Sequence, residues 1–344
     1  MDIFEQLPGA LLPWYEAHKR ELPWRQNRDP YRIWISEIML QQTRVEAVKG
    51  YYSRFLEKLP DVEALSSASD ELLHKLWEGL GYYSRVRNLK KAALIIMEKY
   101  NGQFPREYAQ VLALPGIGAY TAGAICSICF EQPTPAVDGN VLRVISRLTD
   151  DKTPIDLPAY KKQVHDRLQR IYPSQAGAFT QGLMELGATI CGPNRKPECD
   201  LCPCNGFCLA RKNGTAEHLP VKKPKNKRRT QEKTVFILSC DGSYALCKRP
   251  NTGLLAGLWQ LPDCPGRLET PEALRYLEQN GLKPREIVRQ VERNHIFTHI
   301  EWVMRGVYVE VSLRDEAYFW LSPEQIRKQM ALPTAYRQFL EEII

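Results

Sequence analysis

Apolar residues recur at helical spacing through the first part of the chain. Phe4, Leu7 and Leu11 begin this pattern, and spacings of three and four residues place side chains on one face of a helix. No convincing alternation of apolar and polar residues occurs in the first 148 residues, so this part is expected to be all-α. Helices are predicted over 1–20, 31–57 (one helix or two), 61–68, 71–77, 89–100, 141–148, 160–172 and 177–190, with a helical hairpin at 108–127.

A different pattern begins after residue 232. The ranges 234–239 and 244–249 are strand-like, and Asp241-Gly242 between them is a hairpin signal. This part is expected to form an α+β domain. The other elements predicted here are a helix over 271–279, a strand over 302–311 and a helix that begins at Ser322-Pro323.

The two patterns are separated by a basic stretch. Residues 222–229 (Lys-Lys-Pro-Lys-Asn-Lys-Arg-Arg) lack apolar periodicity, which is typical of an exposed linker. This stretch either follows the phosphates of a nucleic acid or is simply solvated. The chain is therefore predicted to contain an α-helical domain (1–212), a basic linker (213–232) and an α+β domain (233–344).

Composition mainly excludes classes of protein. The 344 residues are 44% hydrophobic and 25% charged, as in an ordinary soluble globular protein. No apolar run is long enough to span a bilayer and the N-terminus is unlike a signal peptide, so no membrane partner is expected. We expect an intracellular, cytoplasmic location, where ten cysteines favour metal binding over disulfides. The net charge of +7 is modest for a nucleic-acid-binding protein.

A glycine-rich turn interrupts the helical pattern at residues 114–118. In Leu114-Pro115-Gly116-Ile117-Gly118, the glycines permit a tight turn and a helix of small residues follows. The N-terminus of such a helix offers backbone N–H groups that bind phosphate. Asp138 lies beyond this helix, beside the same site, and an ordinary helix-capping aspartate is the equal alternative.

One carboxylate stands in an unusually apolar helix. Glu37 lies within the stretch 33–40, which is otherwise almost entirely apolar. Carboxylates are seldom buried unless they are paired or functional, and burial raises a carboxyl pKa toward the value that a general acid needs near neutral pH. The alternative places Glu37 on a polar surface stripe, and the residue taken alone favours that alternative.

Arginines follow aromatic residues at two turns. Arg25 follows Trp24, and Arg85 follows Tyr82 and Tyr83 after a pair of glycines. Rings that stack on bases, next to cations that pair with phosphates, suit a nucleic-acid surface. Buried aromatic residues in ordinary loops explain the same pattern equally well. The stretch 295–299 (His-Ile-Phe-Thr-His) is, by itself, an ordinary connecting turn.

Four cysteines lie close together before the linker. Cys191, Cys199, Cys202 and Cys208 are separated by seven, two and five residues. Such a set can hold tetrahedral zinc or an iron–sulfur cluster. Zinc sites more often pair two Cys-x2–4-Cys knuckles, and only one close pair occurs here, so the cluster is favoured. Cys204 is a spare thiol that complicates the ligand assignment.

Several of these motifs, in this order, resemble those of one enzyme family. The turn at 114–118 with Val137-Asp138-Gly139-Asn140 resembles the helix-hairpin-helix and downstream aspartate of the base-excision DNA glycosylases. The segments 36–43 and 79–85, with the four cysteines, narrow this resemblance to the adenine DNA glycosylases, over essentially the whole chain. The cysteines alone would also fit endonuclease III.

The resemblance implies a fold and a reaction. The fold would be a helix-hairpin-helix glycosylase domain with an iron–sulfur loop (191–208) holding one [4Fe–4S] cluster, followed by a Nudix-like domain. The reaction would hydrolyse the N-glycosidic bond of adenine paired with 8-oxoguanine or G in duplex DNA, after the adenine is flipped out. Glu37 would protonate adenine N7 and Asp138 would stabilise the oxocarbenium ion, with support from Tyr120 and Asn140.

The resemblance also implies DNA contacts. Gln42 and Tyr82 correspond to a wedge that distorts the base stack, and Phe297-Thr298-His299 corresponds to the turn that recognises 8-oxoguanine. Many members have Ser where this chain has Thr298, and the seven-residue spacer after Cys191 is one residue longer than the common spacing. The further DNA contacts expected are Arg25, Arg85, Leu114, Gly116 and Gly118.

Three rival functions are weighed against this one. A glycosylase with strand-cutting lyase activity would need a lysine where this chain has Tyr120. A non-catalytic DNA-binding protein would require Glu37 and Asp138 to be ordinary surface acids. A Nudix pyrophosphatase needs an acidic metal-binding box that residues 257–282 lack. The expected partner is duplex DNA, bound by a monomer, and other repair proteins are further candidate partners.

Overall fold

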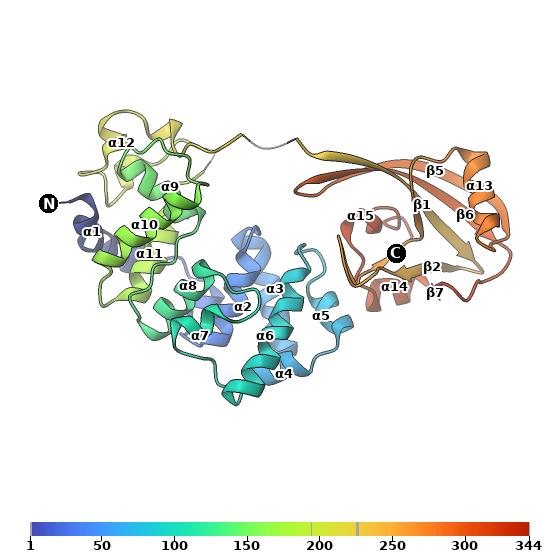
Figure 1. Ribbon diagram of the computed structural model, residues 1–344, viewed down its shortest axis with the longest axis horizontal. Helices are drawn as coiled ribbons and strands as arrows, with labels where there is room; N and C mark the ends of the chain where they lie inside the picture. Colours follow the sequence, from blue (N-terminus) through green and yellow to red (C-terminus); the bar gives the residue numbers. More distant parts are fainter. Residues whose placement is uncertain (1, 194, 225–226, 344) are drawn as a thin grey trace. The chain divides into compact units, whose positions relative to one another are not determined.

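The computed structural model describes residues 2–193, 195–224 and 227–343, which form two compact units (Figure 1). Unit 1 contains the described residues up to Ala68 and from Asn88 to Pro224. Unit 2 contains Ser69–Arg87 and the described residues from 227 onward. The units divide the chain differently from the boundary expected near residue 213, because the segment 69–87 joins the C-terminal part. Two residues of the basic linker, 225 and 226, lie outside the described residues.

Unit 1 is helical, as the sequence predicts. None of the described helices has the length and apolar character needed to cross a bilayer. The unit contains α1 (Ile3–His18), α2 (Pro30–Leu40), α3 (Val45–Lys58), α4 (Val62–Ser67), most of α6 (Ser84–Tyr100), α7 (Tyr108–Leu112), α8 (Ala119–Phe130), α9 (Gly139–Leu148), α10 (Pro158–Ile171), α11 (Ala176–Thr189) and α12 (Leu209–Lys212), with short 3₁₀ turns η1 (Pro23–Arg25), η2 (Cys199–Leu201) and η3 (Ala216–His218).

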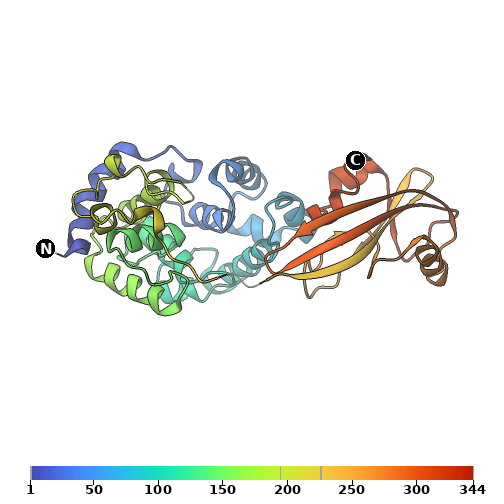
Figure 2. The same ribbon diagram turned by 90° about the horizontal axis from the view of Figure 1, so that it is seen from above.

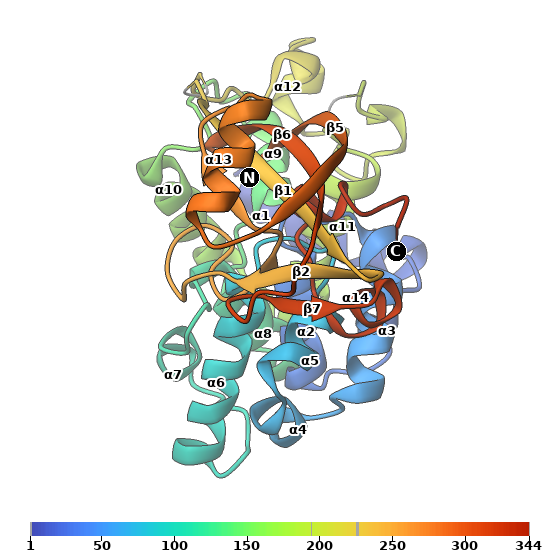
Figure 3. The ribbon, with the colours of Figure 1, turned by 90° about the vertical axis from the view of Figure 1, so that its right-hand side faces the viewer.

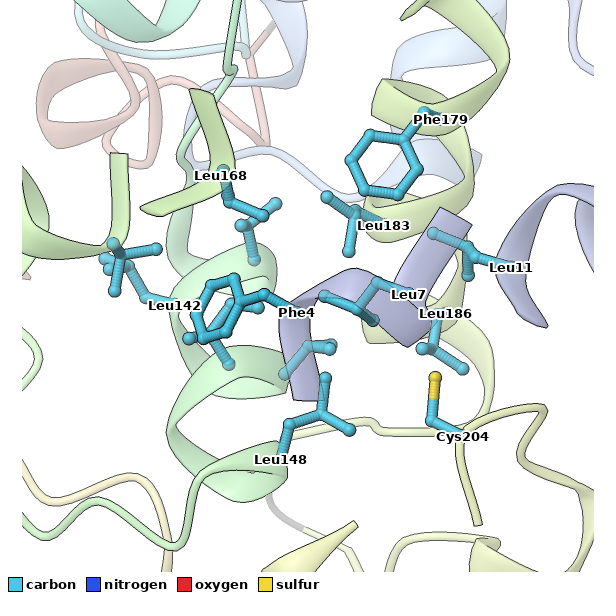
Figure 4. Packing of buried hydrophobic residues seen from close by; sticks show 14 of the residues in the cluster. Phe4, Leu7, Leu11, Leu142, Leu148, Leu168, Phe179, Leu183, Leu186 and Cys204 are labelled. Carbon is cyan, nitrogen blue, oxygen red and sulfur yellow. The ribbon is translucent and has the colours of Figure 1, made fainter. Parts of the chain in front are cut away.

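One core of unit 1 forms where α1, α9, α10 and α11 pack together. Figure 4 shows Phe4, Leu7 and Leu11 of α1 beside Phe179, Leu183 and Leu186 of α11. Gly182 lets these two helices approach closely, since a Cβ there would lie 3.1 Å from the Leu11 side chain. Burial of this apolar surface stabilises the unit. It also fixes the C-terminal end of α11 beside the start of α9.

Unit 2 is built on a mixed sheet. Among the described residues its elements are α5 (Asp70–Leu76), β1 (Arg229–Cys240), β2 (Ser243–Lys248), β3 (Trp259–Gln260), β4 (Asp263–Pro265), α13 (Thr270–Gln279), β5 (Pro284–Ile296), β6 (Ile300–Val311), β7 (Phe319–Leu321), α14 (Pro323–Gln329) and α15 (Thr334–Arg337). The strand order is β3-β2-β1-β6-β5, with β4 on β1 and β7 on β2. The β1–β6 pair is parallel and the long β5–β6 pair is antiparallel (Figure 2).

Alternate residues of β1 face two separate cores. Val235 and Ile237 pack with Tyr336 of α15 and Ile326 of α14. Phe236 and its neighbours on the other face pack against α13. This is the two-residue period of a strand buried on both faces. Figure 3 shows α13 on one side of the strands and α14 on the other.

The segment 69–87 is attached to unit 2 by polar contacts. The ammonium of Lys75 donates to the carbonyls of Arg327 (2.7 Å) and Met330 (3.0 Å) at the C-terminal end of α14, where a cation is favoured. The Leu332 N–H donates to Glu78 at 3.1 Å, and Arg87 donates to the Ala256 carbonyl at 2.7 Å.

Two differences from the predicted elements have clear physical causes. The helix predicted to begin at residue 89 begins at Ser84, because the turn of Gly79–Gly81 ends in a left-handed Tyr82 and helical hydrogen bonding starts at once. The strand β5 was not predicted. It lies at the edge of the sheet and has no fully buried residue, and its half-buried positions include Arg289 and Arg293 while Val288 and Ile296 are exposed, so its apolar pattern is weak.

Candidate active site

Four residues singled out for catalysis line one cleft in unit 1. Glu37, Tyr120, Asp138 and Asn140 all face a space of about 1160 Å³. They come from α2, the first turn of α8 and the start of α9. More than eighty residues separate Glu37 from Tyr120, so only the packing of these three helices brings the group together.

Glu37 is buried, at 6% exposure, so the surface-stripe alternative does not hold. Asp29 caps α2 by accepting from the Tyr31 N–H at 2.8 Å, and the residues from Ile33 to Met39 are all buried. The Tyr120 hydroxyl donates to Glu37 Oε2 at 2.5 Å. Burial raises the pKa of Glu37 to about 7, and the nearby Asp138 carboxylate adds to this, while the Tyr120 hydrogen bond opposes it.

The glycine-rich turn places Tyr120. Gly116 has a φ of +78°, and a Cβ there would lie 2.7 Å from the Asn88 side chain, so glycine is required on both grounds. Leu114 is buried beneath the turn, and Gly118 begins α8 without a side-chain cap. Burial, with the nearby carboxylates of Glu37 and Asp138, raises the pKa of the Tyr120 phenol, which therefore stays protonated as a donor.

Asp138 is both a helix cap and a member of the cleft. It accepts from the Val141 N–H at 2.8 Å and from Asn140 Nδ2 at 2.7 Å. Burial raises the pKa of Asp138 although these hydrogen bonds favour its ionised form. The capping interpretation and the cleft interpretation therefore apply to the same side chain.

A buried arginine connects this cap to the cysteine loop. Arg143 donates to Asn140 Oδ1 at 2.8 Å and to the Cys191 carbonyl at 2.8 Å. It also donates to the Gly187 carbonyl at 2.6 Å. Gly187 itself leaves no space for a side chain, because a Cβ would lie 2.6 Å from that of Asn140. The position of Asn140 thus depends on the start of the cysteine loop.

A buried ion-pair group in the cleft was missed from the sequence. Glu185 of α11 is 1% exposed and binds Arg20 (2.6 Å) and Arg25 (2.7 Å). Burial alone would raise the pKa of Glu185, but its hydrogen bonds with the two arginines outweigh burial and lower it. The available signal was the one used for Glu37, a carboxylate inside the apolar run 182–187.

Two arginines expected at DNA are held by the protein itself. Arg25 lines the cleft but is bonded to Glu185 and to the Arg20 carbonyl at 3.1 Å. Arg85 donates to the carbonyls of Leu80 and Gly81 and lies over the Trp77 ring. Burial lowers the pKa of Arg85 to about 10. Both side chains therefore stabilise local structure in unit 1 and unit 2 respectively.

The two residues expected to form a wedge share an unusual backbone. Gln42 follows α2 with a φ of 62°, and Tyr82 precedes α6 with a φ of 47°. Left-handed backbone is uncommon for such residues and is often found at functional positions. Both side chains are exposed. The local geometry therefore directs two polar-tipped side chains to solvent from tight turns.

The four predicted metal ligands line one small cavity. Cys191, Cys199, Cys202 and Cys208 all border a space of about 20 Å³, together with Arg147. The Glu198 N–H donates to the Ile190 carbonyl at 3.1 Å, which closes the loop and returns Cys199 to Cys191 despite the longer spacer. Within the described part of the chain no such group meets the geometry of a site for a single metal ion.

The spare cysteine has a different environment. Cys204 is fully buried in the apolar core, where Figure 4 shows it among the leucines. Arg147 donates to Cys191 Sγ at 3.2 Å, which is a favourable contact for a thiolate. The structure thus separates a core cysteine from four that face a common space.

The turn singled out in the α+β domain borders a second pocket, within unit 2. This pocket of about 680 Å³ is lined by Phe297, Thr298 and His299 on one side and by the 79–84 turn on another. The hydroxyls of Tyr82 and Thr298 are hydrogen bonded. Arg87 and Arg228 add positive charge to its wall.

Comparison with protein families finds two matching regions along the chain. Residues 35–173 match the HhH-GPD superfamily of base excision DNA repair proteins, and residues 234–342 match the NUDIX domain. An adenine DNA glycosylase from Buchnera aphidicola is 34% identical, over 88% of this chain and 86% of its own. The chain belongs to the adenine DNA glycosylase family.

Eukaryotic members of this adenine DNA glycosylase family are longer. The Arabidopsis thaliana protein is 38% identical over 89% of this chain, and the human protein is 36% identical over 85%. The chain spans 57% and 65% of their respective lengths.

Solved structures resemble the helical part of the chain. A thermostable thymine-DNA glycosylase has 30% identity and a TM-score of 0.56, covering 61% of this chain and 97% of its own. A trapped covalent complex of endonuclease III with DNA has 26% identity and a TM-score of 0.51, covering 61% and 98%. The fold of unit 1 is therefore shared with glycosylases of other specificities.

Proposed function

We propose that this protein is a monofunctional DNA glycosylase that removes adenine paired with 8-oxoguanine or G in duplex DNA, as a step of base excision repair. The observation that carries this proposal is the buried Glu37, bonded to Tyr120 in the cleft that Asp138 also lines. Relatives covering most of the chain are named adenine DNA glycosylase. A raised-pKa acid beside a second carboxylate is the arrangement that glycosidic cleavage requires.

Adenine reaches the cleft only when it leaves the base stack. Flipping exposes the base and its glycosidic bond, which a duplex otherwise hides. With a pKa of about 7, Glu37 carries a proton in a large fraction of molecules at neutral pH. Tyr120 occupies Oε2, so Oε1 is the atom that carries this proton to adenine N7.

Protonation makes adenine a leaving group. The bond from C1′ to N9 breaks, its electron pair stays with the base, and positive charge develops on the sugar. The ionised Asp138, oriented by Val141 N–H and Asn140, stabilises that charge in a buried site where electrostatic effects are large. Water then adds to C1′ and loses a proton, which leaves an abasic site.

The strand is expected to remain uncut. Schiff-base chemistry needs an amine, and Tyr120 occupies the place of the lyase lysine. The raised pKa of this phenol keeps it protonated and poorly nucleophilic. Borohydride treatment during turnover should trap no covalent DNA adduct, whereas a strong adduct would contradict the monofunctional assignment.

The pocket of unit 2 is proposed to hold the 8-oxoguanine. Relative to guanine this base carries a hydrogen on N7 and an oxygen on C8, so a hydroxyl can distinguish the two. Thr298 is exposed at the pocket and already bonded to the Tyr82 hydroxyl. The absence of the acidic Nudix box from residues 257–282 supports a reading role for this unit over nucleotide hydrolysis.

The four cysteines are proposed to hold one [4Fe–4S] cluster. They face a common cavity, and the Arg147 guanidinium beside Cys191 Sγ suits a thiolate ligand. When bound, the cluster supplies a rigid centre around which the loop 191–208 folds. Iron content and broad visible absorption of anaerobically prepared protein would support this, and stoichiometric zinc would contradict it.

A single-turnover assay tests the proposed function. Duplexes with A opposite 8-oxoguanine, G, T or C are mixed with excess protein, and free adenine and strand cleavage are measured. Release should be fastest opposite 8-oxoguanine, slower opposite G and without strand cleavage. Duplex binding with no adenine release would indicate the rival function, a non-catalytic DNA-binding protein.

A further inference from the structure

The turn between β5 and β6 packs against the core of unit 2 through the ring of Phe297. The Phe297 N–H donates to the Ile300 carbonyl at 2.8 Å and closes the turn. Thr298 and His299 at its tip are exposed, whereas Phe297 is partly buried against the core beneath. The Phe297 side chain therefore supports the turn from the core side, while the Tyr82 hydroxyl bonds to Thr298 and the Arg229 N–H donates to the His299 carbonyl at 3.1 Å.

Beneath Phe297 lies a buried tryptophan. The rings of Phe297 and Trp302 meet edge to face, with centroids 4.8 Å apart. The ring of His295, which pairs with Trp302 across the two strands, also meets the Phe297 ring edge to face, with centroids 4.6 Å apart. Such contacts favour defined relative orientations of the rings. Trp302 is 2% exposed, so the Phe297 ring of the turn packs on a buried side chain.

Several side chains contact Trp302 in turn. Its indole N–H donates to Gln231 Oε1 at 3.0 Å. The Lys233 ammonium lies 4.6 Å from the centre of the ring, in a cation–π contact. Tyr336 packs edge to face against it at 5.9 Å.

Lys233 and Tyr336, which both contact Trp302, bind the same carboxylate. Lys233 forms an ion pair with Asp263, and the Tyr336 hydroxyl donates to Asp263 Oδ2 at 2.6 Å. All three side chains are mostly buried. A buried and satisfied polar network restricts side-chain positions more strongly than apolar packing alone.

We propose that Trp302 is a positioning residue that sets discrimination between 8-oxoguanine and guanine, an inference that rests on the proposed function of the 297–299 turn. Two bases that differ at N7 and C8 are distinguished only if the hydroxyl is held to within about 0.5 Å. Trp302 provides that precision through Phe297. It touches neither the base nor the reacting atoms of the cleft.

A matched pair of substitutions tests this role. Trp302→Phe removes the indole N–H and part of the ring surface on which Phe297 packs. Trp320→Phe makes the same change in the same unit, where the indole N–H donates to the Asp315 carbonyl at 2.9 Å and the ring packs against the other core. Affinities of the full-length proteins are measured for duplexes carrying a non-cleavable adenine analogue opposite 8-oxoguanine or G.

The preference for 8-oxoguanine over G is the decisive quantity. Trp302→Phe should lower this ratio about fivefold, as expected when one hydrogen bond is misplaced, and leave the affinity for the A:G duplex unchanged. Trp320→Phe should leave the ratio unchanged. An equal loss for both duplexes in Trp302→Phe, or the same ratio in the two variants, would overturn the proposal.

A milder variant covers the case in which Trp302→Phe does not fold. Gln231 is exposed, and Gln231→Ala removes only the acceptor of the indole N–H. It should lower the ratio about two- to threefold, and an unchanged ratio would overturn the proposal. A wild-type ratio of one would instead contradict the proposed function. A ratio lowered by Phe297→Ala but by neither Trp302→Phe nor Gln231→Ala would contradict this inference alone.

Discussion

The cleft of unit 1 and the pocket of unit 2 use polar side chains in opposite ways. In the cleft the charged groups are buried and bonded in advance, as Glu37 is to Tyr120 and Glu185 to Arg20. In the pocket the polar tip of Thr298 is exposed and its support comes from rings beneath. A reaction in which charge develops needs buried carboxylates with shifted pKa values. Recognition of a nucleobase instead needs an accessible hydroxyl on a rigid support.

The largest expected effect is the loss of catalysis, without loss of DNA binding, when a carboxylate of the cleft is removed. Glu37→Gln and Asp138→Asn should each lower the single-turnover rate of adenine release by about 10²–10⁴-fold. Affinity for the duplex with A opposite 8-oxoguanine should change little, because the pocket is untouched. Rapid-quench kinetics and gel-shift binding measure the two effects.

A control lies in the same cleft. Glu46 also lines it but is exposed and forms an ion pair with Lys49 on its own helix. Glu46→Gln should leave release unchanged. A large loss in this control, or unchanged release in both Glu37→Gln and Asp138→Asn, would show that the buried carboxylates are not the source of the activity.

A pair of cysteine substitutions sharpens the comparison, because the cysteine loop supports the cleft through Arg143. Cys199→Ser should lose the visible absorption and iron, and excision should fall with them. Cys204→Ser should keep both, and should lower the free energy of unfolding by about 1–3 kcal/mol because a hydroxyl is buried in the core. If Cys204→Ser lost the cluster and Cys199→Ser kept it, Cys204 and not Cys199 would be the ligand.

The pH dependence should appear in the cleft and not in the pocket. Since the pKa of Glu37 is about 7, its protonated fraction falls about tenfold per pH unit above that value. Release under single-turnover conditions should follow this fraction, whereas the 8-oxoguanine-to-G binding ratio should stay constant. A release rate that rises between pH 7 and 9 would exclude Glu37 as the proton donor.

The same shift predicts a stability effect. A carboxyl whose pKa rises from 4.5 to about 7 on folding favours the unfolded state as pH increases through this window. Glu37→Gln mimics the protonated form, so it should be more stable than wild type by about 3 kcal/mol at pH 8. The difference should vanish near pH 4. Denaturant unfolding at the two pH values measures it.

A smaller effect than in the cleft is expected when the pocket loses its hydroxyl. Thr298→Val removes the hydroxyl and keeps the shape, so the preference for 8-oxoguanine over G should fall about tenfold, the worth of one hydrogen bond. Thr298→Ser is the control and should retain the preference. The A:G release rate should be unchanged in both. A tenfold loss of A:G release in Thr298→Val would mean that the pocket and the cleft are not separable.

The sequence predicts helices and strands better than it predicts which residues contact one another in the fold. The cap at Ser322 is present as predicted, whereas the helix predicted from residue 89 begins at Ser84. Glu37 was recognisable as a carboxylate in an apolar run, but its burial depends on helices that pack on both sides of α2. Its partner Tyr120 lies too far along the chain for any local pattern to join them.

Two further residues show the same limit. Arg85 beside tyrosines is typical of a nucleic-acid surface, yet its guanidinium is bonded to the carbonyls of its own turn. Cys204 could not be separated from the ligand set by spacing, because burial in the core depends on distant helices. For Cys204 the deciding contacts are tertiary, whereas for Arg85 they lie within its own turn, and in neither case does the type of residue reveal them.

The most direct test of the central claim is the single-turnover rate of adenine release by wild-type protein and Glu37→Gln on one duplex carrying A opposite 8-oxoguanine. The account predicts rapid release of adenine by wild type, with the strand intact, and a loss of about 10²–10⁴-fold in the variant with binding preserved. Equal rates for the two proteins, or release of another base in place of adenine, would contradict it.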